Sequence, residues 1–187
     1  MQELKNTATQ MRMKVIDMIY KAQSGHPGGS LSAADFVTAC YFKYMNLDPK
    51  NPRWEDRDWL VLSKGHAGPV AYATFGLMGF YPMEEAYTLN QPHTKFPSHT
   101  DRKLTPGVDL TTGSLGQGIS AACGMALGAK HAGKPINVYT ILGDGEVEEG
   151  ECWEAFMFAA HYGLSNLCVV LDRNHLQIDG TTETVMN

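Results

Sequence analysis

The chain has 187 residues, of which 43% are hydrophobic and 19% charged. This composition is typical of a folded globular protein and excludes an intrinsically disordered one. The formal net charge of -5 argues against a nucleic-acid binder, which usually carries a basic surplus or stripe. Apolar stretches are interrupted before they reach the roughly 20 residues that span a bilayer, and residues 1–6 lack the apolar segment typical of a signal peptide.

The four cysteines are scattered and include no Cys-x-x-Cys pair. In a chain of this length such cysteines are expected to be buried thiols in a reducing compartment, not a disulfide frame or a zinc site. A cytoplasmic location and no membrane contact are therefore expected. The cysteines are Cys40, Cys123, Cys152 and Cys168.

Apolar periodicity predicts a series of helices and short apolar strands. Ser32 and Asp35 are spaced as in a capping box, which favours a helix that begins near Ser32. Helices are expected over residues 7–23, 32–45, 67–78, 83–89, 116–130 and 149–162, and strands over 59–63, 137–142 and 167–171. Residues 90–108 are expected to form a loop, and a loop of that length in a compact domain is uncommon unless it is functional.

The clearest pattern is a strand, a helix and a strand between residues 137 and 171. Such a βαβ unit implies parallel strands in a sheet that is covered on both faces. The expected fold class is therefore α/β, a mostly parallel sheet flanked by helices on both faces, in a single domain over residues 1–187. Residues 178–187 are expected to form a loop that leads into another element. Further sequence is therefore expected after residue 187.

Polar residues follow both strands of this unit. Gly143-Asp144-Gly145 follows the first strand and Asp172-Arg173-Asn174 follows the second. Ligands of open parallel sheets bind beyond the carboxyl ends of the strands, so Asp144 and Asn174 are expected at one edge. A carboxylate and an amide oxygen suit Mg²⁺ or Ca²⁺, and the glycines let a diphosphate approach backbone N–H groups.

An aspartate in an ordinary turn is the alternative interpretation of Asp144. A Rossmann dehydrogenase is disfavoured because no Gly-x-Gly-x-x-Gly follows either strand, and a P-loop is disfavoured because no Gly-x-x-x-x-Gly-Lys-Ser/Thr does. A phosphatase-like metal hydrolase that uses Asp144 also remains possible, although Asp172 alone offers a second carboxylate.

The wider sequence resembles the N-terminal part of transketolase, in particular the N-terminal subunit of the two-chain form. The likeness spans almost the whole chain, and its motifs occur in the family order. They are Ser24-Gly25-His26-Pro27-Gly28, Leu62-Ser63-Lys64-Gly65-His66-Ala67, Thr111-Thr112-Gly113-Ser114-Leu115-Gly116-Gln117-Gly118 and Gly143-Asp144-Gly145-Glu146-Val147-Glu148-Glu149-Gly150.

This resemblance implies a domain that binds thiamine diphosphate through Mg²⁺, or through Ca²⁺ or Mn²⁺. The metal ligands it implies are the side chains of Asp144 and Asn174 and the backbone carbonyl of Leu176. The cofactor-binding residues it implies are His66, Gly113, Ser114, Leu115, Gly143, Asp144, Gly145, Glu149, Glu154 and Asn174. Ser114 departs from the family pattern, which often has proline there.

Three histidines in glycine-rich breaks are the catalytic residues that the resemblance implies: His26, His66 and His99. Imidazole suits proton transfer because its pKa lies near the working pH. The context of His99, Pro97-Ser98-His99, departs from the usual Pro-Gly-His-Pro. A satisfied structural role is the alternative for any one of them.

Glu149 and Glu154 have two interpretations. Both are placed where the dipole of a helix start favours acids, and the resemblance instead puts them in a carboxylate network at a subunit interface.

The resemblance implies transfer of a two-carbon ketol unit from a ketose to an aldose, with the hard chemistry supplied by the cofactor. The glutamate that activates the cofactor belongs to a pyrimidine-binding domain, which this chain lacks. A C-terminal transketolase subunit is therefore the expected partner, in an α2β2 assembly. The chain is expected to be inactive without this partner. Alternatives are a subunit related to 1-deoxyxylulose-5-phosphate synthase or to 2-oxoacid dehydrogenases, or a non-catalytic structural subunit. The sugar substrate, phosphorylated, sulfonated or neither, is left open.

Overall fold

The computed structural model describes residues 1–178 and 180–186. These residues form two compact units, each built from segments that are distant in the sequence. The first unit comprises residues 1–57 and 66–111, and the second comprises residues 58–65 and 112–187.

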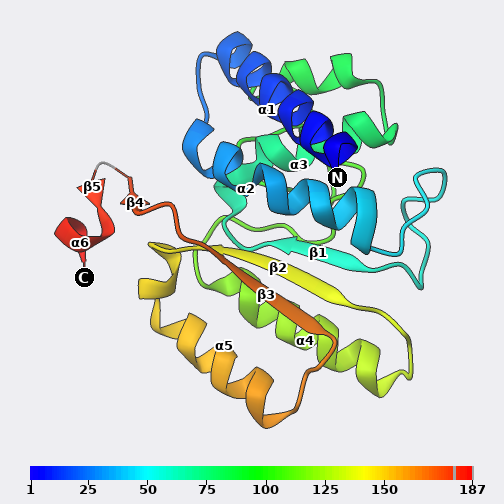
Figure 1. Cartoon of the computed structure of the whole chain (residues 1–187), viewed down its shortest axis with the longest axis vertical. Coiled ribbons are helices and arrows are strands. Elements are labelled where there is room, and N and C mark those ends of the chain that lie inside the picture. Colours follow the sequence, from blue (N-terminus) through cyan, green and yellow to red (C-terminus); the bar gives the residue numbers. More distant parts are fainter. Residues whose placement is uncertain (179, 187) are drawn as a thin grey trace. The chain divides into compact units, whose positions relative to one another are not determined.

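Three helices, α1 (Gln2–Ala22), α2 (Pro27–Ala39) and α3 (Gly68–Met78), pack against one another in the first unit (Figure 1). The buried face of α1 carries Met11, Val15 and Met18 at helical spacing. A π-helical turn, Cys40–Tyr44, continues α2, and a 3₁₀ helix, Met83–Thr88, follows α3. Residues 90–108 contain turns and no regular element, as the sequence predicts.

The start of α2 differs from the sequence-based prediction, which placed it near Ser32. The helix begins at Pro27, whose fixed φ and missing N–H suit a first helical position. Ser32 lies inside the helix and donates from its hydroxyl to the Gly29 carbonyl at 3.4 Å. Asp35 forms an ion pair with Arg12 of α1 and caps nothing. The capping-box pattern therefore came from a serine bonded within its own helix and an aspartate that pairs with the neighbouring helix.

The second unit is built on a parallel sheet with strand order β1-β2-β3, as Figure 1 shows. The strands are β1 (Trp59–Leu62), β2 (Val138–Gly143) and β3 (Leu167–Asp172). Helix α4 (Gln117–His131) packs against all three strands, and α5 (Gly150–His161) packs against α4. The parallel register of β2 and β3 confirms the predicted βαβ unit.

The last described segment differs from the expected loop. Strand β4 (Leu176–Gln177) pairs antiparallel with β5 (Gly180–Thr181), and a short helix α6 (Thr182–Val185) follows. Thr181 caps α6 by accepting a hydrogen bond from the Thr184 N–H at 3.2 Å. The part of the expected loop that falls on residues 179 and 187 lies outside the described residues.

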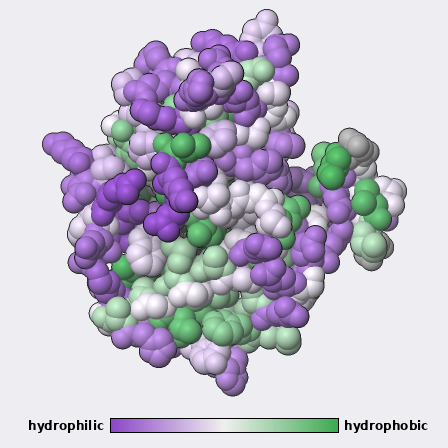
Figure 2. Space-filling view, turned by 180° about the vertical axis from the view of Figure 1, so that it is seen from behind, coloured by the Kyte–Doolittle hydropathy of each residue, from purple (hydrophilic) through white to green (hydrophobic). Residues whose placement is uncertain are grey.

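Large apolar side chains remain exposed on the second unit, on α5 and on β3. Figure 2 shows one face of the molecule, on which hydrophobic areas interrupt the hydrophilic surface. Trp153 is 61% exposed and Met157 66% exposed, and both lie on α5. Clustered exposed apolar side chains of this kind mark surfaces that bind other chain segments or proteins. Within the described ranges, none of the helices has the length and apolarity needed to cross a membrane.

Candidate functional site

The carboxyl ends of the three parallel strands meet at one edge of the second unit. Gly143, the last residue of β2, is in register with Asp172, the last residue of β3. Asp144 follows Gly143 directly, and Asn174 lies two residues after Asp172. The parallel register thus brings together the two residues that the sequence predicts as metal ligands.

The carboxylate of Asp144 joins the turn after β2 to the turn after β3. Its Oδ1 accepts a hydrogen bond from the Gly145 N–H at 3.1 Å, and its Oδ2 accepts one from the His175 N–H at 2.6 Å. The residue is only 9% exposed. Among the residues that the structure describes, no cationic side chain forms an ion pair with it. Its negative charge is therefore balanced by backbone dipoles alone.

The side chain of Asn174 orders the turn that follows β3. Its Oδ1 accepts a hydrogen bond from the Leu176 N–H at 2.9 Å, which is an Asx turn. His175, between them, has a positive φ of 64°. Asn174 thus fixes the local backbone that carries the Leu176 carbonyl, the third predicted ligand.

The donors at this edge fit a hard divalent cation. They are a carboxylate, a side-chain amide oxygen and a backbone carbonyl, the oxygen ligands that Mg²⁺ and Ca²⁺ prefer. The buried Oε1 of Gln177 has no hydrogen-bond partner among the described residues. A Cβ on Gly145 would lie 2.9 Å from Gln177 Cγ, so only glycine fits at this turn. The turn thus combines an acid without a cationic partner among the described residues, an unsatisfied acceptor and a glycine packed against the Gln177 side chain.

The predicted cofactor loop 113–115 lies against the end of β1. The Thr112 hydroxyl donates to the Leu62 carbonyl at 2.7 Å. A Cβ on Gly65 would come within 2.8 Å of the Gly113 nitrogen. Gly116 has a φ of 86° and caps α4. Glycines therefore permit the close backbone contact that places this loop at the same strand edge.

Two buried ionic groups at this edge were not predicted from the sequence. Lys64 is 1% exposed and forms an ion pair with Asp172. Glu146 is 2% exposed and accepts hydrogen bonds from three separate segments. The available signals were a lysine directly after a buried strand and a glutamate directly after Gly-Asp-Gly.

The three predicted histidines gather in the first unit. The ring centroids of His26 and His66 are 5.4 Å apart, and those of His26 and His99 are 5.9 Å apart. They come from the start of α2, the turn before α3 and the long loop. The structure thus brings together histidines that are up to 73 positions apart in the sequence.

The loop that carries His99 is held by the start of α3. The Tyr72 hydroxyl donates to the Pro97 carbonyl at 2.7 Å, and a Cβ on Gly68 would lie 2.9 Å from the Ser98 carbonyl oxygen. Partial burial lowers the pKa of His99, and the neighbouring His26 lowers it further. A lowered pKa keeps the His99 ring neutral and able to accept a proton near pH 7.

Glu149 and Glu154 are exposed near the start of α5. The structure is compatible with both interpretations given for them, a helix start and a subunit interface.

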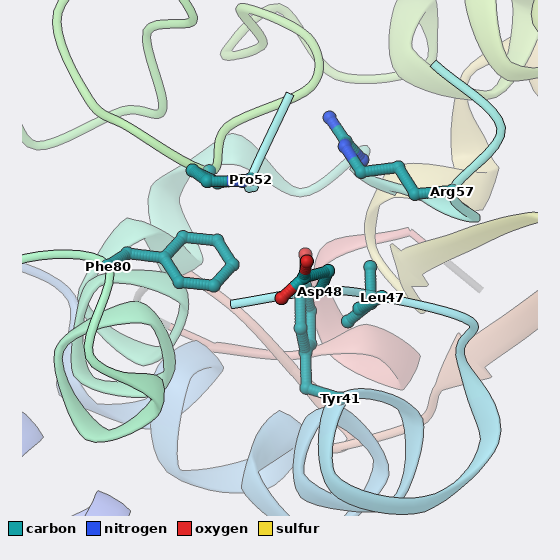
Figure 3. Close-up of a pocket in the computed structure, with 7 residues that line it drawn as sticks. Tyr41, Leu47, Asp48, Pro52, Arg57 and Phe80 are labelled. Carbon is teal, nitrogen blue, oxygen red and sulfur yellow. The ribbon is translucent and has the colours of Figure 1, made fainter. Parts of the chain in front are cut away.

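A pocket in the first unit contains none of the predicted site residues. It is a narrow hollow without room for a ligand, and Figure 3 shows Phe80 facing Asp48 and Tyr41 across it. Its lining residue Arg57 forms an ion pair with buried Asp109. Neither group of predicted residues therefore contributes to this pocket.

A family model described as "Transketolase, thiamine diphosphate binding domain" matches residues 4–187. A 6-deoxy-6-sulfo-D-fructose transketolase subunit of Clostridium sp. is 49% identical over 98% of this chain and 66% of its own length. An apulose-4-phosphate transketolase subunit of Phocaeicola vulgatus is 40% identical over 94% of this chain and 62% of its own. The chain thus spans less than two thirds of each of these relatives.

Solved structures show the same fold. Transketolase from Leishmania mexicana superposes with a TM-score of 0.94 at 33% identity, over 98% of this chain and 29% of that one. Transketolase from Campylobacter jejuni superposes with a TM-score of 0.93 at 36% identity, over 100% of this chain and 30% of that one. The predicted α/β fold is therefore confirmed.

Proposed function

The chain belongs to the transketolase thiamine diphosphate-binding family, and from this membership we propose that it is the diphosphate-binding part of a two-chain transketolase. The match over residues 4–187 supports one functional domain over residues 1–187. The observation that carries the proposal is the strand edge at which Asp144 accepts a hydrogen bond from the turn that contains Asn174 and Leu176.

We assign a divalent ion, Mg²⁺ by preference, to these three residues. Asp144 supplies the negative charge, and its backbone hydrogen bonds orient it. Gly143 and Gly145 let the diphosphate approach, and the loop 113–115 would contact the aminopyrimidine ring. When bound, thiamine diphosphate supplies the nucleophilic carbon for transfer of a two-carbon unit. An acidic chain that binds a polyanion needs a cation between the two, and the metal meets this need.

The histidine cluster has a proposed role in proton transfer. His26, His66 and His99 would donate hydrogen bonds to sugar oxygens and carry protons to and from them. The lowered pKa of His99 supports a neutral ring that accepts a proton at the working pH.

The partner we propose is a C-terminal transketolase subunit with the pyrimidine-binding domain and the activating glutamate, in an α2β2 assembly. Relatives that are named as subunits support it. The exposed apolar side chains of α5 and β3 leave a surface for further chain segments or subunits. The interface role of Glu149 and Glu154 belongs to the same proposal. The four cysteines are free, which agrees with the proposed cytoplasmic location, but Cys168 is exposed where a buried thiol was expected.

The donor we propose is a ketose with an anionic terminal group. One relative is named for a sulfonated ketose and another for a phosphorylated one. Reconstituted protein should be assayed with matched sulfonated, phosphorylated and unsubstituted ketoses. Activity with the unsubstituted sugar alone would refute an anionic donor.

The decisive test of the site is Asp144→Ala in the chain assembled with its partner subunit. Calorimetry should show tight thiamine diphosphate binding by the unaltered protein only when Mg²⁺ is present. The variant should lose at least about 100-fold in affinity, because a first ligand of the metal is removed. Glu148→Ala, an exposed acid in the next turn, is the control and should bind normally. Unchanged cofactor binding and turnover in Asp144→Ala would contradict the proposed metal site.

A further inference from the structure

A single buried carboxylate connects the two loops to which cofactor contacts are assigned. Glu146 Oε1 accepts hydrogen bonds from the Ser63 hydroxyl at 2.5 Å and from the Gly116 N–H at 3.0 Å. Its Oε2 accepts one from the Gly143 N–H at 3.0 Å. The side chain thus joins the end of β1, the start of α4 and the end of β2.

From this geometry we infer that Glu146 is a positioning residue, which sets the separation between the loop 113–115 and the turn 143–145. Gly116 follows the first of these loops directly and Gly143 begins the second, and the N–H groups of both glycines donate to the same carboxylate. Glu146 does not touch the cofactor in this inference. It acts through the backbone groups to which cofactor contacts are assigned. The inference therefore rests on the proposed function.

The charge of Glu146 is needed for this role. A buried carboxylate is costly unless it is fully hydrogen-bonded, and hydrogen bonds to a charged acceptor are the stronger ones. Two backbone N–H groups point at different oxygens of the same carboxylate. In Glu146→Gln, either orientation of the amide places an NH₂ group against one of these N–H donors. No amide flip satisfies both, so the two loops must separate.

The surroundings of Glu146 make this carboxylate hard to replace by water. It is 2% exposed, and its backbone carbonyl also accepts the Cys152 thiol at 3.4 Å. Burial raises the pKa of Cys152 to about 11, with Glu146 as a smaller cause, so this thiol stays protonated and donates. On the other side, a Cβ on Gly118 would lie 2.5 Å from Ser63 Oγ, so helix α4 packs closely against the Ser63 hydroxyl.

The test measures cofactor binding by the chain assembled with its partner subunit. In Glu146→Gln we expect the dissociation constant for thiamine diphosphate with Mg²⁺ to rise about 10- to 100-fold, the usual effect of altering a residue that orients ligands. Ser63→Ala keeps the charge and removes one donor, so a rise of about 2- to 10-fold is expected. Glu148→Gln removes the same charge two residues away on the surface and should leave the constant unchanged.

Steady-state kinetics separate positioning from a merely structural role. We expect the KM for thiamine diphosphate to rise in Glu146→Gln while kcat at saturating cofactor stays within about twofold, since the effect lies in binding. A lower melting temperature of the cofactor-free variant with an unchanged cofactor constant would overturn the inference. If Glu146→Gln does not fold, the Ser63→Ala variant tests the inference instead. An unchanged dissociation constant for thiamine diphosphate in Ser63→Ala would also overturn the inference.

The same experiment distinguishes failure of the inference from failure of the proposed function. If the unaltered assembly binds no thiamine diphosphate with Mg²⁺, the proposed function is wrong and the inference falls with it. If the unaltered assembly binds it, Asp144→Ala does not, and Glu146→Gln binds as tightly as the unaltered protein, only the inference is wrong.

Discussion

Individual residues at the ends of the strands carry the chemistry that this structure supports. Asp144 and Asn174 are 30 positions apart in the sequence, yet the parallel register of β2 and β3 makes them neighbours. Their places after the two strands were predictable, because the strands of a βαβ unit are parallel and end at the same edge of the sheet. Their role as metal ligands stays a prediction. The partners of each oxygen were not predictable, because they depend on backbone turns after the strands.

His99 leads to a prediction about stability and pH. Its pKa in the native protein lies below the usual value of 6.5. As pH falls through 6.5 the unfolded chain binds a proton that native His99 does not, so stability decreases toward acid. His99→Asn should therefore weaken the pH dependence of the free energy of unfolding between about pH 7 and pH 5.

Urea unfolding at several pH values measures this effect. His93→Asn is the matched control, since His93 is an exposed histidine on the same loop and asparagine tolerates its positive φ of 63°. Equal pH slopes for His99→Asn and the unaltered protein would contradict the assignment.

At the scale of elements, helix α4 illustrates what glycine achieves by position. Gly118 faces the end of β1, where an added Cβ would lie 2.5 Å from the Ser63 Cα. Gly124 lies on the same helix, and an added Cβ there meets no atom within 4 Å. The alanine- and glycine-rich sequence of this helix suits close packing against another backbone. Which glycines make the contact was decided by the rotation of α4 against the sheet.

Two alanine substitutions in α4 should therefore have opposite effects. Gly118→Ala is expected to lower the free energy of unfolding by about 1–3 kcal/mol, because the backbone of β1 must shift. Gly124→Ala is expected to raise it by about 0.5–1 kcal/mol, since alanine is the better helix former. Chemical denaturation of both variants measures this, and stabilisation of equal size at the two sites would show that helix propensity, and not packing, is responsible.

At the scale of the whole molecule, buried ion pairs join distant segments of each unit. In the first unit Arg57 pairs with Asp109, 52 positions away, and their side chains are 13% and 3% exposed. Burial by itself would lower the pKa of Arg57, but the hydrogen bond and charge of Asp109 raise it above its usual value. The pair therefore remains ionised inside the fold.

Removal of one partner should destabilise the protein strongly. Asp109→Ala leaves a buried guanidinium uncompensated and is expected to cost about 3–5 kcal/mol of the free energy of unfolding. Asp35→Ala, which breaks the exposed pair with Arg12, is the control and should cost at most about 1 kcal/mol. Thermal and urea unfolding compare the two variants. Similar small losses in the free energy of unfolding would show that the Arg57 guanidinium is hydrated in the native state.

The sequence alone determined the helices and strands with strong periodicity, the βαβ unit and the positions of Asp144 and Asn174 after its strands. Each of these depends on local pattern or on the fixed geometry of parallel strands. Only the tertiary structure decided the start of α2, the burial of Lys64 beside Asp172, and the role of Glu146 between two loops. Local sequence cannot distinguish a buried charge from a solvated one, because the difference lies in partners that long-range packing supplies.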